Sequence, residues 1–336
     1  MPPISTEAII EEKVKPESTR NCPSRCEPRL NPPDGNLHAM GLTNVGMSCF
    51  INSVLNSLYF VPQFYQYFYA VTAETTLVTL MKKFVTKYGK EKIARPLLGE
   101  IAEHFPKFPI GAMGSAFDFL RSLLNGINEE TQERPSTSSV LHAYGSRSFH
   151  DIFSILIEEM RKCSVCNHTT VTSLFETPTL DFNIAQSHPV RVGRDKLPSR
   201  ASLPLSLDAF LSEQADSPEN MHTCRNCNQD QIHINKKSIK RIGSAVVIYL
   251  QRFTSLNPQA FVTVPHTLDM SKYLKGAGSY SLCSVIHHSG DLNWGHYKCF
   301  ALSAKGWMCL NDEKATFLRD PWSEISASTL FIYRLE

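Results

Sequence analysis

The chain has 336 residues, of which 42% are hydrophobic, so it can bury a large core as one catalytic unit with subdomains. Its formal net charge of +2 is close to balance and implies no nucleic-acid or membrane-surface partner. One basic cluster, Lys236–Lys237 with Lys240–Arg241, is interpreted as a solvated face, with a nuclear-import patch as the alternative.

The ten cysteines are expected to be reduced. No apolar run approaches the ~20 residues that span a bilayer. The N-terminus also lacks the apolar stretch of a secretory signal. We therefore expect a cytoplasmic or nuclear protein whose cysteines serve as metal ligands, nucleophiles or core residues.

Residues 1–36 are rich in proline and scattered charges and show no sustained periodicity, which predicts a disordered segment. Cys22 and Cys26 lie within it. Because two ligands alone do not make a metal site, these cysteines are interpreted as unpaired thiols.

Helical patterns dominate the next part of the chain. Apolar residues recur every four positions from Phe50 to Leu58, which predicts a helix that ends at Pro62. Further helical segments, broken at two prolines, are expected within 77–124. The polar, Ser- and Thr-rich segment 126–145 predicts a loop.

After about residue 170 the pattern changes to short alternating runs, which are strand signals. Helices followed by strands predict an α+β fold with a largely antiparallel sheet. The expected strands are Val246–Leu250, Phe261–Val264, Tyr280–Ile286, Tyr297–Leu302, Trp307–Leu310 and Leu330–Tyr333.

Cys49 stands where a glycine-flanked loop turns into the first helix. A thiol at a helix N-terminus lies near unpaired N–H groups, which predicts a lowered pKa and a reactive thiolate. The same N–H groups, with the side-chain amide of Asn44, could bind an oxyanion. The alternative is that Cys49 is a small buried hydrophobic residue.

Two strands around a Gly-containing turn predict a hairpin over residues 295–312. If Leu302 faces Trp307, His296 lies within diagonal reach of Asn311, the geometry of a Cys-His-Asn triad. A one-residue slip would put Asp312 in the place of Asn311. The neighbouring His287 and His288 are rival histidines without a preceding glycine.

Two CxxC pairs, Cys163 with Cys166 and Cys224 with Cys227, predict a tetrahedral zinc site of four thiolates. Such a site has no open coordination position, so the zinc would be structural. A redox CxxC pair is the alternative. His168 and His222 flank the pairs and are interpreted as surface residues.

These motifs together resemble the ubiquitin-specific proteases. Segment 41–53, GLTNVGMSCFINS, is similar to the cysteine box of that family. Segments 280–290 and 295–312 are similar to its histidine box, and the CxxC pairs fall where the family carries its zinc-bearing fingers. YLQRF at 249–253 and VPHTLD at 264–269 also resemble family segments.

The resemblance implies a papain-like fold of thumb, palm and fingers over residues 37–336. The thumb would take about 37–150, the fingers about 158–250, and the palm the remainder. It also implies ubiquitin as partner and hydrolysis of the bond after the C-terminal glycine of ubiquitin.

The resemblance also implies a role for each site residue. Cys49 would be the nucleophile, His296 the general base and Asn311 its orienting residue. Asn44 would be the oxyanion donor and Asp312 a substitute third member of the triad.

The family's Gln-Gln-Asp-Ala-x-Glu-Phe segment is altered here to MGSAFDF at 113–119. Met113 and Ser115 replace polar and charged groups that help to hold the ubiquitin tail. We therefore keep two alternatives to a deubiquitinase: a protease for another ubiquitin-like modifier, and a non-catalytic ubiquitin-binding scaffold. An activating protein partner is a further expectation.

Overall fold

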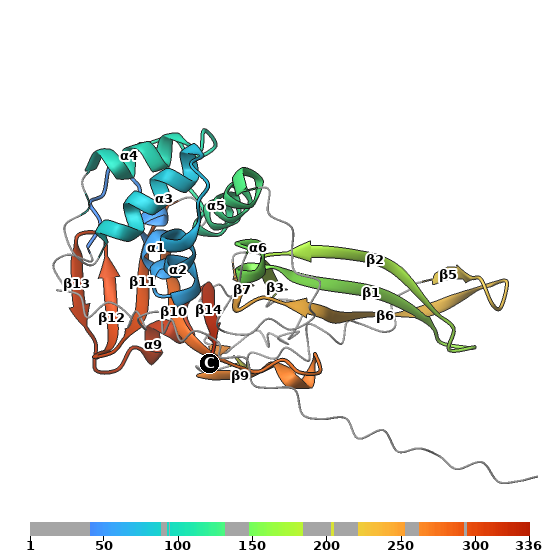
Figure 1. The fold of residues 1–336 in the computed structure, drawn as a ribbon. Coiled ribbons are helices and arrows are strands. Elements are labelled where there is room, and N and C mark those ends of the chain that lie inside the picture. The colour runs from blue at the N-terminus through green and yellow to red at the C-terminus, as the bar shows by residue number, and fades with distance from the viewer. Residues whose placement is uncertain are drawn as a thin grey trace, which may run out of the picture. The chain divides into compact units, whose positions relative to one another are not determined.

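The computed structural model describes residues 41–88, 93, 95–131, 148–183, 203–204, 221–252, 262–291 and 294–336 (Figure 1). For 203–204 only the backbone is described. The segment predicted to be disordered, with Cys22 and Cys26, lies outside the described residues.

Five helices form the first part of the fold, and all but one begin or end as their residues predict. The first helix ends at Tyr59, and Pro62 then opens the second helix at its first turn, where the missing N–H of proline has no cost. The helices are α1 Cys49–Tyr59, α2 Pro62–Ala70, α3 Thr76–Lys87, α4 Arg95–Glu103 and α5 Ala116–Thr131.

The prediction of a loop from residue 126 is wrong for its first six residues, because α5 continues to Thr131. A Cβ placed on Gly126 would lie 3.0 Å from the side chain of Leu77 in α3. The glycine therefore marks a close contact between two helices and not the end of one.

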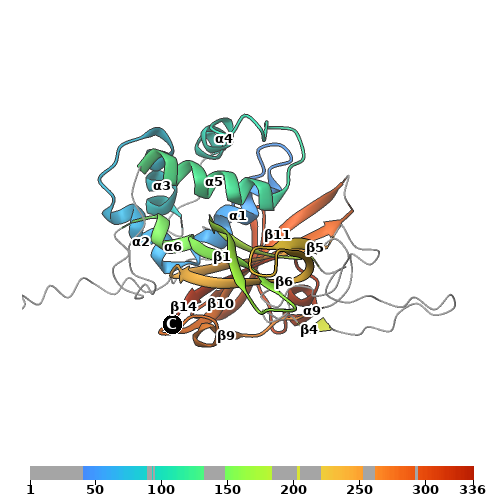
Figure 2. The same ribbon diagram turned by 90° about the vertical axis from the view of Figure 1, so that its right-hand side faces the viewer.

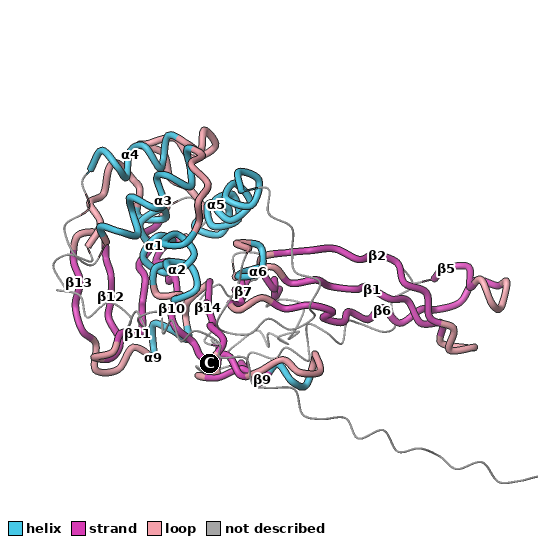
Figure 3. The backbone as a smooth tube through the Cα atoms, in the orientation of Figure 1, coloured by secondary structure: helices cyan, strands magenta, loops and turns pink. Residues whose placement is uncertain are grey.

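The main sheet has the strand order β13-β12-β11-β10-β14-β7-β3, with β9 paired to β10 (Figure 3). All its pairings are antiparallel except β3 with β7, which confirms the predicted α+β fold with a largely antiparallel sheet. The strands are β3 Thr179–Asn183, β7 Ala245–Gln251, β9 Thr267–Asp269, β10 Ser279–Gly290, β11 Gly295–Ser303, β12 Gly306–Asn311, β13 Lys314–Phe317 and β14 Leu330–Leu335.

A second, four-stranded sheet, called the arm below, has the order β2-β1-β6-β5. Its first strand begins before residue 170, earlier than the alternation predicts. The strands of the arm are β1 Ile155–Cys163, β2 Thr169–Thr177, β5 Met221–Cys224 and β6 Gln229–Ile242.

Four short elements complete the described fold. Two strands of two residues each, β4 and β8, pair in parallel. The other two are short α-helices. The elements are β4 Leu203–Pro204, β8 Val262–Thr263, α6 His150–Phe153 and α9 Trp322–Ser326.

The main sheet has a hydrophobic cluster on each face. Along β7, Ala245 and Val247 belong to the cluster shared with the helices, whereas Val246, Ile248 and Leu250 belong to the other. Figure 2 shows the helices stacked above the strands on the first face. Every residue of α1 is buried, so this helix has a fixed position against the sheet. In the part of the chain that is described, no helix has the length and apolarity to cross a bilayer.

Candidate active site and metal centre

The loop before α1 brings Cys49 to the first position of the helix. Gly46 and Met47 both have positive φ, at 113° and 51°. The side-chain oxygen of Asn44 accepts hydrogen bonds from the backbone N–H of Gly46 at 3.0 Å and of Ser48 at 3.1 Å. These bonds hold the tight turn that delivers the thiol to the helix N-terminus.

Burial controls the acidity of Cys49, whose side chain is 9% exposed. Loss of solvent raises the pKa of the thiol above its ordinary value, and the negative charge of Asp312 raises it further. Hydrogen bonds from the backbone of Tyr297, Phe50 and Cys49 itself act in the opposite direction but are weaker. The lowered pKa predicted from the helix N-terminus is therefore wrong for this resting structure.

The hairpin of β11 and β12 has the predicted register, because Leu302 pairs with Trp307. His296 and Asn311 then meet: Nε2 of the imidazole donates to the side-chain oxygen of Asn311 at 2.6 Å. This bond places the proton of a neutral imidazole on Nε2 and leaves Nδ1 as the basic nitrogen. The backbone of the next residue, Tyr297, contacts Cys49.

Asp312 lies on the opposite side of the strand end from Asn311 and contacts the nucleophile loop. Its two carboxylate oxygens accept from the side-chain amide of Asn44 at 3.1 Å and of Asn52 at 2.8 Å. Its φ is +48°, and its carbonyl accepts from the N–H of Leu42 at 2.8 Å. The structure therefore places Asp312 where it holds Asn44, with Asn311 on the imidazole.

The two rival histidines have other surroundings. His287 is mostly buried beside Ser328, and loss of solvent lowers its pKa to about 4. His288 stacks on Tyr297 with ring centroids 4.4 Å apart. A Cβ on Gly295 would lie 2.2 Å from Nε2 of His288. The glycine before His296 therefore makes room for a neighbouring histidine.

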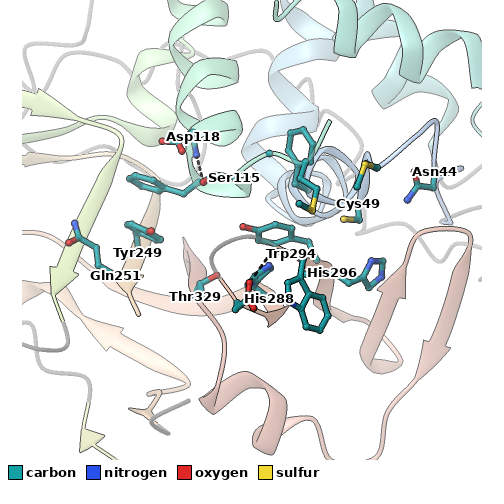
Figure 4. Close-up of a pocket in the computed structure, with 18 residues that line it drawn as sticks. Asn44, Cys49, Ser115, Asp118, Tyr249, Gln251, His288, Trp294, His296 and Thr329 are labelled. Carbon is teal, nitrogen blue, oxygen red and sulfur yellow. Dashed lines mark hydrogen bonds between the residues drawn. The ribbon is translucent and has the colours of Figure 1, made fainter. Parts of the chain in front are cut away.

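A cleft of about 820 Å³ runs beside these groups, between the helices and the main sheet. Figure 4 shows Cys49, His296 and Asn44 at one end and Tyr249 with Gln251 at the other. The exposed side chains of Met47, Met113 and Trp294 also line the cleft.

Sequence reasoning missed Asn52, which is buried in the middle of α1. An amide in a helix that is otherwise apolar is costly to bury without partners. Asn52 donates to the backbone carbonyls of Leu42 and Thr43 as well as to Asp312. Its position three residues after Cys49 was the signal that could have identified it.

Four sulfur atoms meet at the far end of the arm. Those of Cys163, Cys166, Cys224 and Cys227 all lie within 4.8 Å of one another. The sulfur of Cys163 lies 4.0 Å from that of Cys227, and Cys166 lies 3.6 Å from Cys224. Tetrahedral zinc with bonds of about 2.3 Å requires sulfurs about 3.8 Å apart, so these four residues fit a zinc ion.

The two halves of this cluster are built alike. Asn167 and Asn228 each follow a CxxC pair and have φ of 59° and 53°. Each N–H donates back to the carbonyl of the first cysteine of its pair, at 3.1 and 2.8 Å. Asparagine tolerates this left-handed backbone, so each turn forms one half-site. His168 is exposed and His222 half-buried, and neither belongs to the cluster.

The electrostatics of the cluster favour a cation. Hydrogen bonds from the backbone of His168 and from Asn226 lower the pKa of Cys166 to about 6. The neighbouring sulfurs raise the pKa of Cys227 to about 12. All four groups become thiolates together only when a positive ion compensates their charge.

Comparison with known proteins identifies this arrangement. The family model "Ubiquitin carboxyl-terminal hydrolase" matches residues 40–333. The chain belongs to the ubiquitin carboxyl-terminal hydrolase family. The resemblance found in the cysteine and histidine boxes is thereby confirmed.

Two relatives define the extent of the similarity to this hydrolase family. "Ubiquitin carboxyl-terminal hydrolase 9" of Arabidopsis thaliana is 30% identical over 140 residues, covering 38% of this chain and 15% of that protein. "Probable ubiquitin carboxyl-terminal hydrolase 16" of Schizosaccharomyces pombe is 23% identical over 311 residues, covering 82% of this chain and 62% of that protein. The chain thus spans less than two thirds of either relative.

A solved member with this fold is the SAGA DUB module Ubp8/Sgf11/Sus1/Sgf73 bound to monoubiquitin. The two chains superpose with a TM-score of 0.72 at 20% identity, over 91% of this chain and 70% of the other. The predicted fold class, an α+β protease fold of the ubiquitin-specific type, is confirmed by this likeness.

Proposed function

We propose that this hydrolase is a deubiquitinating cysteine protease that cleaves the peptide or isopeptide bond after the C-terminal glycine of ubiquitin. The observation that carries the proposal is the contact of Cys49 with the backbone of Tyr297 beside a His296 imidazole bonded to Asn311. This arrangement supplies a nucleophile, a base and an orienting group within one family member.

In the proposed reaction, Nδ1 of His296 accepts the thiol proton as the sulfur of Cys49 attacks the carbonyl carbon. The tetrahedral intermediate collapses to a thioester when the imidazolium gives its proton to the leaving amine. A water molecule, deprotonated by His296, then attacks the thioester, which releases the carboxylate and restores the thiol. Because burial keeps the resting thiol protonated, proton transfer accompanies the attack.

Asn44 is the proposed donor to the oxyanion. Its amide nitrogen gives one hydrogen to Asp312, and its oxygen is occupied by the nucleophile loop. The second amide hydrogen is thereby oriented, and Asn44 lines the cleft next to Cys49. An oriented donor needs no reorganisation during the reaction, which is the source of its catalytic effect.

The altered tail-binding segment supports a second candidate, a protease for another ubiquitin-like modifier. The hydroxyl of Ser115 accepts from the N–H of Asp118 at 3.2 Å, so it caps α5. Met113 is 49% exposed in the cleft and offers no charge to a cationic tail. Asp118 is the exposed carboxylate that lines this wall.

We further propose that the four-cysteine cluster binds one structural zinc ion, supported by the spacing of its sulfurs. The zinc would stabilise the end of the arm and supply no chemistry to the cleft. We assign α1 to α5 to a thumb and the arm to fingers, a division supported by their separation along the chain at about residue 150.

The test is covalent labelling of the purified chain by ubiquitin with a C-terminal thiol-reactive group, beside a panel of ubiquitin-like modifiers. We expect a ubiquitin adduct that is lost in Cys49→Ala. Labelling by another modifier alone would support the second candidate. The absence of any adduct from folded, metal-loaded protein would refute catalysis by the isolated chain and leave a scaffold or a partner-activated enzyme.

A further inference from the structure

Two aromatic rings from opposite walls of the cleft are stacked on each other. Phe117 stands in the first turn of α5 and Tyr249 in β7, and both line the cleft. Their ring centroids are 3.7 Å apart and the ring planes differ by 11°. Rings at this separation are in van der Waals contact, so nothing can pass between them.

The stack lies at a defined distance from the reacting groups. In the main sheet β7 is three strands from β11, the strand of His296, in the order β11-β10-β14-β7. Strands are spaced about 4.8 Å apart, so Tyr249 lies at least about 14 Å from that strand, the length of about four extended residues. Figure 4 shows Tyr249 at the end of the cleft away from Cys49.

The stack has its own support on both sides. The guanidinium of Arg121, one turn further along α5, lies 5.4 Å from the ring centroid of Phe117, so this ring is covered on two faces. Burial and the nearby carboxylates of Asp118 and Asp181 raise the pKa of the Tyr249 hydroxyl, which remains neutral.

Opening the stack does not require the core to open. Ala116, Phe119 and Leu120 are the buried residues around Phe117 in α5, whereas Phe117 itself is only half-buried. Its ring can therefore turn toward solvent while the helix stays packed. A rotation of this kind in a partly exposed side chain is fast compared with turnover.

The proposed substrate cannot avoid this barrier by threading. Its tail carries a folded modifier at one end and the conjugated protein at the other, so it must enter the cleft sideways. We propose that Phe117 and Tyr249 form a gate across the cleft that the tail must part before its last residue reaches Cys49. This inference rests on the proposed function, because it concerns how that substrate enters.

The experiment compares two reagents on Cys49 in Phe117→Leu, Tyr249→Leu and the wild type. The ubiquitin probe must pass the gate, whereas iodoacetamide is small enough to reach the thiol without doing so. Phe317→Leu is the matched control, because this ring is 44% exposed on β13 and distant from the cleft wall formed by α5. Alkylation of Cys49 is followed by peptide mass spectrometry and also reports that each variant is folded.

Leucine keeps apolar bulk and removes the stacking. We expect ubiquitin labelling to become about two- to tenfold faster in both cleft variants, the range that corresponds to the usual strength of an aromatic pair. The iodoacetamide rate should stay unchanged, and Phe317→Leu should match the wild type. Labelling of the variants but not of the wild type would support the gate most strongly.

Two results would overturn the gate while leaving the proposed function intact. Unchanged ubiquitin labelling in both variants would mean that the rings do not limit entry. Slower labelling would mean that they hold the tail instead of excluding it. If no chain, wild type or variant, reacts with the ubiquitin probe although iodoacetamide still modifies Cys49, the proposed function fails and the gate fails with it.

Discussion

The catalytic cleft and the cysteine cluster both join distant parts of the chain, but by different means. Asn44 and Asp312 are 268 positions apart, and they meet because α1 is buried on all sides against the sheet. Cys166 and Cys224 are 58 positions apart, and each belongs to a half-site that its own turn builds.

The surroundings of the two sites differ in the same way. Along β2 of the arm, the side chains are exposed or half-buried, and Val171 and Leu174 are 56% and 59% exposed. The arm therefore has little apolar burial to hold its end together, and a bound metal would replace the missing core. The comparison teaches that a core positions the catalytic groups, whereas coordination would position the cysteines.

The largest expected effect is on the arm. Cys224→Ser should abolish binding of the proposed zinc and expose β5 and β6 to rapid amide exchange, because three thiolates and a hydroxyl make a weak zinc site. Metal analysis and hydrogen exchange measure this, with Cys309→Ser, a half-buried thiol of β12, as control. Equal metal content in the two variants would contradict the assignment. Iodoacetamide should still modify Cys49 normally.

His296→Ala should slow hydrolysis by about 10²–10⁴-fold, the usual contribution of a general base. The stability of the fold should change little, because the imidazole is half-buried at the end of its strand. Turnover of a fluorogenic ubiquitin amide measures the loss, and His168→Ala on the exposed arm is the matched control. A loss shared by both variants would argue against a role as base.

Asn44→Ala should lower kcat by about 10²–10³-fold and leave KM nearly unchanged, since an oxyanion donor acts on the transition state. Steady-state kinetics with the same substrate separate the two constants. A rise in KM at constant kcat would instead indicate that Asn44 only shapes the loop.

Asp312→Asn removes the negative charge that helps to raise the Cys49 pKa, so the pH midpoint of alkylation should fall. In the wild type the midpoint should lie above the ordinary value of 9.0, because burial is the larger cause. Iodoacetamide rates across pH test both statements. Turnover should nevertheless decrease, because Asn44 loses its acceptor. A midpoint that rises would show that the carboxylate does not act on the thiol.

The same pKa has a consequence for stability. The folded chain holds the Cys49 proton more tightly than the unfolded chain, so this group stabilises the fold below about pH 8.5. That contribution is lost as the pH rises through the folded pKa. The effect is small beside the others, and Cys49→Ala should remove it from an alkaline unfolding curve.

Much of the site could be predicted because it depends on local spacing. The turn at Gly306 fixes the hairpin register, which brings His296 to Asn311. Each CxxC pair forms its half-site from adjacent residues. Gly126 misled the prediction because a glycine that ends a helix and one that admits a neighbouring helix look the same in sequence.

The sequence by itself determined the order of the motifs, the register of the hairpin and the identity of the metal half-sites, since these follow from neighbouring residues. Only the tertiary structure decided the raised pKa of Cys49, the attachment of Asp312 to Asn44 and the stacking of Phe117 on Tyr249. The physical reason is that burial, charge and ring contacts depend on residues far apart along the chain, whose approach is set by the packing of the whole core.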